Sequence, residues 1–105
     1  MSRLSTTTDQ DRLHNPHAGE MLASEFMEPL QLDVEALAEA INVKSSRLEA
    51  LINGVRAVDA ELDLRLSRYF QMSEGFFLRL QNSYELLEAK RALNGDLDRI
   101  VPRAA

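Results

Sequence analysis

The sequence contains no cysteine, and this absence excludes several kinds of chemistry. A chain of 105 residues without a thiol has no disulfide framework, no thiolate metal site and no cysteine nucleophile. Such a composition suits the reducing cytoplasm, where we expect this protein to act. The apolar runs are only a few residues long and the N-terminus is polar, so we expect neither a membrane-spanning helix nor a secretion signal.

Residues that commonly carry catalysis are also scarce. The two histidines, His14 and His17, fall outside the predicted helices, where neither could serve as a base, and there is no glycine-rich phosphate loop. His14, His17 and Glu20 could be taken for a metal cluster, but Pro16 breaks any helix that would align them. We therefore expect neither an enzyme nor a bound metal or cofactor.

Basic residues are fewer than acidic ones. The chain has 12 Lys and Arg against 17 Asp and Glu, a net charge of -5, whereas a nucleic-acid-binding protein is expected to show a basic face. The length allows one domain with a single core, and 45% apolar residues indicates a folded globule. Because total charge does not show where the charges lie, a local basic patch is still possible.

The sequence does have one apolar pattern that repeats across a tight turn, within residues 33–56. Asp33 and Ser45 stand where helix N-caps are expected, and Asn42 tolerates the left-handed conformation that a corner between helices requires. Residues 42–44 match the turn length of a helix-turn-helix, a motif whose second helix enters the DNA major groove. The apolar residues at helical spacing are Val34, Leu37, Ala38, Ile41, Leu48, Leu51 and Ile52.

Three further helices are predicted around residues 33–53, which gives an all-α fold of five helices. One begins at Gly19, one at an Asp59 N-cap, and a long C-terminal one, capped by Ser73, covers about residues 74–94. The apolar faces expected to be buried are Leu22, Phe26 and Leu30 in the first helix, Leu62, Leu66, Tyr69 and Phe70 in the fourth, and Phe77 and Leu80 in the fifth. We expect residues 1–15 to be a flexible tail, 16–94 the helix-turn-helix domain, and 95–105 a C-terminal tail.

The start of the second helix of the motif supplies the candidate DNA contacts. Arg47 could bond a guanine with two hydrogen bonds, and Ser45 and Ser46 could bond a base edge or a phosphate. At the edges of the motif, Lys44 and Arg56 suit contacts with phosphates. The alternative is an ordinary helix start with solvated charges. The complete candidate set is Lys44, Ser45, Ser46, Arg47, Asn53 and Arg56.

The outer part of the C-terminal helix is predicted to form a dimer interface. Tyr84, Leu87 and Leu93 lie where little of the domain is left to cover them, so we expect them to pack against a second copy. Two recognition helices about one turn of DNA apart would then contact a palindromic operator.

With these elements in order, the sequence resembles the HigA-type antitoxins, which belong to the phage-repressor-like (XRE) helix-turn-helix family. The resemblance covers roughly residues 16–94 and rests on the segments HAGEML and EFMEPLQL, the NG-x-R loop, and the segments LRLSRYF and FFLRLQNSYEL. It implies a dimeric antitoxin that represses its own operon and neutralises a HigB or RelE-like mRNA-cleaving toxin. The sequence departs from the family's pattern at Val34, Glu39, Asn42, Lys44, Ser45 and Glu49.

The partner surface and the function leave alternatives. An mRNA-cleaving toxin is expected to be basic, so the acidic residues Glu20, Glu25 and Glu28 are candidates for contacting it. One alternative function is a stand-alone transcriptional repressor with no toxin gene beside its own. The other is a protein-interaction module that kept the helix-turn-helix shape but lost DNA binding, which the net acidity and Val34 favour.

Overall fold

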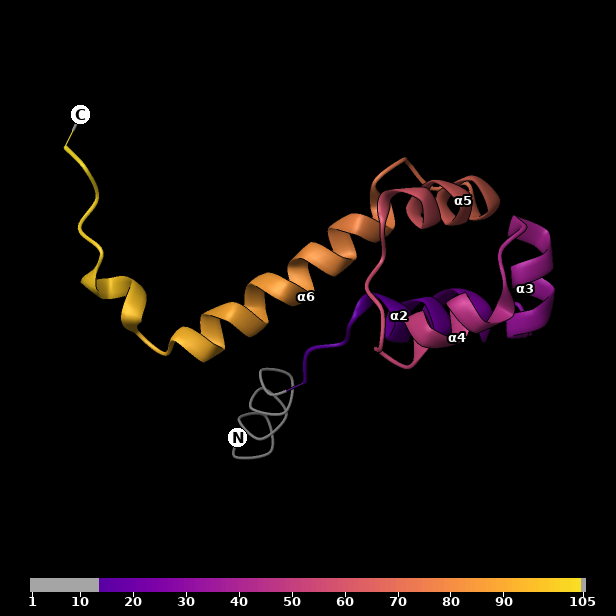
Figure 1. Ribbon diagram of the computed structural model, residues 1–105, viewed down its shortest axis with the longest axis horizontal. Coiled ribbons are helices and arrows are strands. Elements are labelled where there is room, and N and C mark those ends of the chain that lie inside the picture. Colours follow the sequence, from indigo (N-terminus) through magenta and orange to yellow (C-terminus); the bar gives the residue numbers. More distant parts are fainter. Residues whose placement is uncertain (1–13, 105) are drawn as a thin grey trace, which may run out of the picture.

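The computed structural model describes residues 14–104 as a set of helices (Figure 1). The described part of the chain contains no strand, so the predicted all-α class is confirmed. Most of the predicted tail over residues 1–15 lies outside the described residues. The α-helices are α2 (Ala18–Met21), α3 (Val34–Ile41), α4 (Ser45–Ile52), α5 (Ala60–Phe70) and α6 (Phe76–Leu93); a π-helical segment, η1 (Leu22–Met27), continues α2, and a 3-10 helix, η2 (Asp96–Arg99), follows α6.

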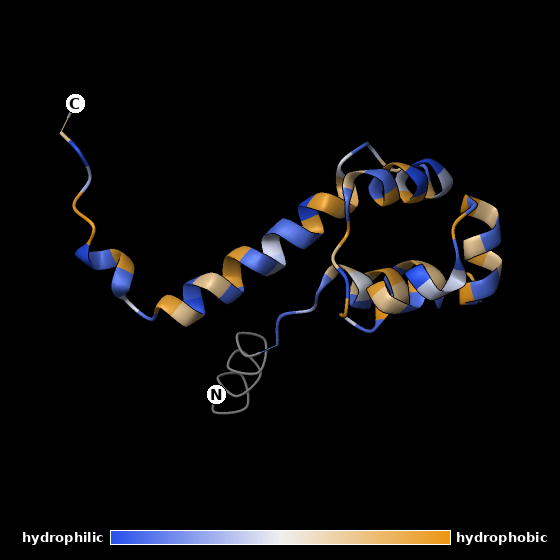
Figure 2. Cartoon of the chain, in the orientation of Figure 1, coloured by the Kyte–Doolittle hydropathy of each residue, from blue (hydrophilic) through white to orange (hydrophobic). Residues whose placement is uncertain are grey.

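Helices α2 to α5 and the start of α6 enclose one core, while the rest of α6 extends away from it (Figure 1). Figure 2 shows the alternation of apolar and polar residues along these helices. Phe77 is completely buried and its ring packs against Phe26, Phe70 and Phe76, with centroids 5.2, 6.3 and 5.1 Å away. Leu80 packs against the same core, as predicted. Among the described residues, no helix is long and apolar enough to cross a membrane.

The first helix departs from the predicted spacing. Its second part is π-helical, so the Glu28 N–H donates to the carbonyl of Ala23, five residues earlier, at 2.9 Å. The wider turn buries Met27 beside Leu22. The prediction that Leu30 belongs to the buried face is wrong, because the helix ends at Met27 and Leu30, which follows Pro29, is 62% exposed.

The helix-turn-helix has the predicted form. Asp33 Oδ1 accepts a hydrogen bond from the Ala36 N–H at 2.7 Å, which confirms the N-cap of α3. Asn42 has φ 60° and ψ 53°, the left-handed conformation expected of it. Three residues, 42–44, separate α3 from α4.

Two predicted N-caps are wrong, Ser45 for α4 and Ser73 for α6. The N-cap position of α4 is occupied by Lys44, which makes no side-chain capping bond, and Ser45 is the first helical residue. Helix α6 begins after Gly75, and the Ser73 hydroxyl instead accepts a hydrogen bond from Arg79 at 2.9 Å. In both cases the hydroxyl lies one or two residues away from the position that a cap requires.

The start of α6 is capped from another helix, by Asp63 of α5. Its carboxylate is 1% exposed and accepts hydrogen bonds from the N–H groups of Gly75 at 2.7 Å, Phe77 at 2.8 Å and Leu78 at 3.0 Å. The buried face of α5 therefore includes a carboxylate. Tyr69, predicted on that face, is 41% exposed, so that prediction is wrong.

Helix α2 holds the C-terminal half of α4. His17 Nδ1 accepts hydrogen bonds from the N–H groups of Gly19 and Glu20, at 3.1 and 3.3 Å, and so caps α2. Gly19 is buried where the two helices cross, and a Cβ there would overlap the carbonyl of Leu51. The backbones of α2 and α4 can approach this closely only because residue 19 has no side chain.

Candidate nucleic-acid interface

A shallow hollow lies beside the start of α4. Four of the six predicted DNA-binding residues line it: Lys44, Ser46, Arg47 and Arg56. The remaining lining residues are Asn42, Val43 and Ala50. The structure therefore brings most of the predicted set together on one surface.

The start of α4 is open to solvent. Lys44 and Ser46 are exposed, and Ser45 is half-buried at the first helical position. Within the described chain, no side chain caps this helix end. The free N–H groups and the positive end of the helix dipole favour an anion here, and the Lys44 ammonium adds to this preference.

Asn53 and Arg56 lie on either side of the loop that follows α4. Asn53 is exposed at the C-cap of the helix, at the opposite end from Lys44, and does not line the hollow. Arg56 is exposed, and its backbone N–H donates to the carbonyl of Ala50 at 3.1 Å, which folds the loop back towards α4. Thus Arg56 lines the same hollow as Lys44, whereas Asn53 lies at the other end of α4, outside it.

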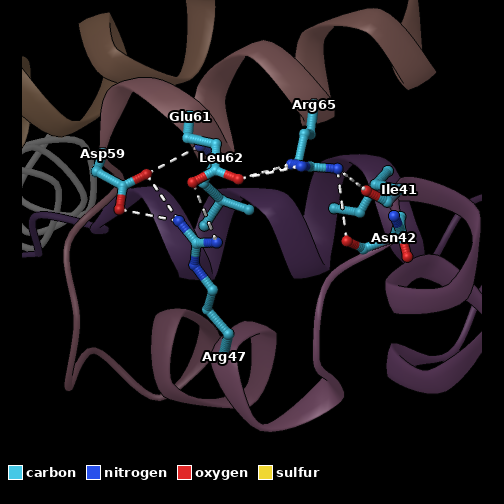
Figure 3. A network of polar contacts seen from close by, with 7 residues as sticks. All are labelled: Ile41, Asn42, Arg47, Asp59, Glu61, Leu62 and Arg65. Carbon is cyan, nitrogen blue, oxygen red and sulfur yellow. Dashed lines mark hydrogen bonds and ion pairs between the residues drawn. The ribbon is translucent and has the colours of Figure 1, made fainter.

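Arg47 is bound to the start of α5. Its Nη2 donates to both carboxylate oxygens of Asp59, at 3.0 and 2.9 Å, and its Nη1 lies 3.8 Å from a Glu61 oxygen (Figure 3). The Arg47 side chain is only 22% exposed. The residue predicted to contact a base is therefore held against a neighbouring helix in this structure.

The same network continues along α5 to the end of α3 (Figure 3). Glu61 accepts a hydrogen bond from Arg65 Nε at 3.1 Å, and Arg65 Nη1 donates to the carbonyls of Ile41 at 2.9 Å and Asn42 at 3.4 Å. Arg65 thus bonds two carbonyls at the C-terminus of α3, where a cation also complements the helix dipole. Helix α5 is linked to both helices of the motif.

Asp59 is the residue on which this network converges. Its Oδ1 also accepts a hydrogen bond from the Leu62 N–H at 2.9 Å, which confirms its predicted role as the N-cap of α5. That bond lowers the pKa of the Asp59 carboxyl below its ordinary value of 3.8; burial opposes the change, and Arg47 and Arg56 lower the pKa further. Sequence reasoning identified the cap but not the arginine that binds it.

The predicted dimer residues lie on the extending part of α6. Tyr84 is half-buried: its carbonyl accepts a hydrogen bond from the Asn15 amide at 3.0 Å, and its ring lies edge-on to that of His17 at 6.0 Å. Leu87 is half-buried and Leu93 is 38% exposed. Further apolar residues are exposed on and after this helix: Leu86 (62%), Leu97 (49%), Ile100 (67%) and Val101 (84%).

Comparisons with known proteins identify the family. No protein-family model matches the chain. The chain is 36% identical over 75 residues to virulence-associated protein I of Dichelobacter nodosus, covering 71% of this chain and 69% of that protein. It is 33% identical over 72 residues to antitoxin HigA-1 of Vibrio cholerae, covering 69% of this chain and 68% of the antitoxin.

A solved structure agrees with these relatives. The fold matches a Pseudomonas aeruginosa protein crystallised with its operator DNA, with a TM-score of 0.81 and 31% identity over 88% of this chain and 98% of that one. The related proteins are antitoxins and transcription regulators, so the prediction that this chain is not an enzyme is confirmed. The chain belongs to the HigA-type antitoxins of the helix-turn-helix family.

Proposed function

We propose that this chain is an antitoxin and autorepressor that acts in the cytoplasm, binds operator DNA as a dimer and neutralises a HigB or RelE-like mRNA-cleaving toxin. The observation that carries the DNA-binding part is the open start of α4, where Lys44 and Ser46 are exposed beside an uncapped helix end. The relative crystallised with its operator supports the same assignment.

The roles of the six candidate residues follow from their positions. Lys44 and Arg56 flank the hollow and would contact phosphates, which fixes the register of the protein on DNA. Ser45 and Ser46, in the first turn of α4, would contact base edges or the adjacent phosphate, and Asn53 would contact the edge of the site. Arg47 could contact a base only after its guanidinium leaves Asp59.

A second copy of the chain would supply the second recognition helix. The exposed apolar residues of the outer part of α6, among them Leu86 and Leu93, support the proposed interface with Tyr84 and Leu87. A two-fold dimer would present two α4 helices to successive turns of a palindromic operator. Dimerisation also compensates for the small number of basic residues in one copy.

The toxin would bind the acidic surface of α2 and η1. Glu20, Glu25 and Glu28 are all exposed there. Beside Glu28 lies a mainly apolar surface formed with Met27, Leu32, Val34 and Ile52. A basic partner with an apolar centre would complement this combination.

One experiment tests both partners. The chain is co-expressed with the protein encoded beside it, purified, and titrated by fluorescence anisotropy against the DNA upstream of its own gene. We expect the neighbour to co-purify and the upstream DNA to bind more tightly than an unrelated duplex. DNA binding without a toxin partner would indicate the stand-alone repressor, and no binding even at low salt would indicate the interaction module.

Charge reversal tests the toxin surface separately. Glu25→Lys combined with Glu28→Lys should reduce co-purification of the toxin while leaving operator binding at least as strong. Asp96→Lys combined with Asp98→Lys, which changes the net charge equally on the exposed helix η2, is the matched control. Full toxin neutralisation by the double variant would remove this surface from the proposal.

A further inference from the structure

We infer that Arg47 is a positioning residue: its ion pair with Asp59 holds the start of the recognition helix α4 against α5 and neutralises the Asp59 carboxylate next to the DNA-facing hollow, and Arg47 does not contact a base. This inference rests on the proposed binding of DNA by α4. It gives Arg47 a positioning role in place of the base contact that its residue type and its place in the sequence favoured.

The geometry of the pair is that of a fixed contact. One guanidinium nitrogen, Nη2 of Arg47, donates to both oxygens of Asp59, at 3.0 and 2.9 Å. The carboxylate itself is held in place, because Oδ1 also accepts the Leu62 N–H at 2.9 Å. Forming the pair therefore orders only the arginine side chain, which costs less conformational entropy than ordering two mobile side chains.

The network places the pair where it controls the motif. Arg47 is in the first turn of α4, and Arg65, linked to it through Glu61, bonds the carbonyls at the end of α3. Helix α5 therefore holds the chain on both sides of the turn over residues 42–44 (Figure 3). Losing Arg47 would release the start of α4 while its C-terminal half stays fixed against Gly19.

Electrostatics gives a second reason for Arg47 to stay on α5. If the guanidinium moved to a base, Asp59 would lose the cation that is bound to it, whereas Glu61 would keep its ion pair with Arg65 at 3.1 Å. Asp59 is an exposed acid, and its partner Arg47 lines the hollow that we expect to face phosphates. An uncompensated Asp59 carboxylate next to this hollow would repel DNA.

The test uses the full chain and the DNA upstream of its own gene, with a set of single base-pair substitutions in that DNA. Arg47→Ala should weaken binding by roughly tenfold, and by the same factor for every substituted duplex. The reason is that the change disturbs the orientation of the start of α4 but removes no base contact. A base contact predicts a different profile, in which preference at one base pair disappears.

A double-mutant cycle provides the second readout. Asp59→Asn keeps an N-cap for α5 but removes the negative charge. Under the inference, Asp59→Asn restores more of the binding lost in Arg47→Ala than of the binding lost in Lys44→Ala, the matched control. Equal restoration in the two backgrounds, or relaxed preference at one base pair in Arg47→Ala, would overturn it.

A measurement without DNA separates this inference from the proposed function. The unfolding midpoints of Arg47→Ala, Asp59→Asn and the double variant should be non-additive, because both single changes remove the same contact. If the wild-type chain binds no DNA but this coupling is present, the proposed function fails, whereas the structural role of the Arg47–Asp59 ion pair is supported. If the changes in unfolding midpoint of the two single variants add up in the double variant, the positioning role of the Arg47–Asp59 ion pair is overturned whatever the DNA result.

Discussion

Helices α4 and α6 begin in opposite ways, although neither has a capping side chain at its own N-cap position. The start of α6 is closed from within by the Asp63 carboxylate of α5, which accepts three backbone N–H groups. The start of α4 carries Lys44 and lies open beside a hollow. A buried helix end must have its donors satisfied, whereas an exposed one can leave them for an anionic ligand.

The difference separates a structural site from a candidate binding site. Both helix ends attract negative charge through the helix dipole. At α6 the protein supplies that charge itself with Asp63, which is 1% exposed. At α4 the N-cap residue is a cation, Lys44, so the helix end favours an anion from outside, as the proposed DNA phosphate would be.

The largest effect should follow from removing the internal cap. Asp63→Ala leaves three N–H groups without an acceptor, one buried and two partly buried, so we expect a loss of about 3 kcal/mol in the free energy of unfolding, measured by urea denaturation. Asp98→Ala on the exposed helix η2 is the control. A change within about 0.5 kcal/mol of wild type would show that α6 does not depend on this carboxylate.

The second largest loss of stability should come from the contact of Gly19 with the C-terminal half of α4. Gly19→Ala places a methyl group on the carbonyl of Leu51, so the two backbones must separate. We expect a loss of about 2 kcal/mol, measured as a lower urea midpoint, with Ser24→Ala on the exposed side of η1 as the control. Unchanged stability would mean that α4 can shift freely, against the view that only its start is open.

Placing an acid at the open helix end should separate stability from binding. Lys44→Asp puts a good capping residue at the N-cap of α4, so the free energy of unfolding should rise by about 0.5–1 kcal/mol. The same change should weaken DNA binding by at least about tenfold, since a phosphate contact is lost and a repulsive charge added. Lys44→Ala should weaken binding less and bring no gain in stability.

If Lys44→Asp bound DNA as tightly as wild type, the open end of α4 would not be the DNA contact. If it were also less stable, the N-cap assignment of residue 44 would be wrong.

The smallest effect concerns the pH dependence of Asp59. Its pKa in the folded chain is below the ordinary value of 3.8, so its contribution to stability is present above that pH and is lost as the pH falls through the folded pKa. We expect Asp59→Asn to lose less stability than wild type when the pH is lowered from 6 to 3, in urea titrations at each pH. Parallel declines would show that this carboxyl does not contribute.

Local signals in the sequence were sufficient for the helix-turn-helix. The N-caps Asp33 and Asp59 and the left-handed Asn42 each depend on neighbours within a few residues, and all three predictions are confirmed. The π-helical turn of η1, which buries Met27, has no such signal, and the end of this helix at Met27 leaves Leu30 exposed. The apolar face of α5 did contain a clue, because Asp63 precedes Leu66 by three residues and therefore lies on the same side of the helix.

The candidate site was predictable in composition but not in its internal contacts. Lys44, Ser46 and Arg56 stand where the spacing of the motif places them, around one hollow. The bond between Arg47 and Asp59 joins residues twelve positions apart on different helices, and no periodic pattern indicates it. The dimer interface of Tyr84, Leu87 and Leu93 stays a prediction, whereas for Arg47 we infer a positioning role in place of the base contact that the sequence favoured.

The most direct test of the central claim compares the two helix starts within one sample. Amide resonances of the isotope-labelled chain are followed by NMR while the DNA upstream of its gene is added. We expect shifts concentrated at residues 44–47 and 56, with Gly75, Phe77 and Leu78, whose N–H groups already bind Asp63, unchanged. Shifts absent from the start of α4, or as large at the start of α6, would contradict the assignment of α4 as the DNA-binding element.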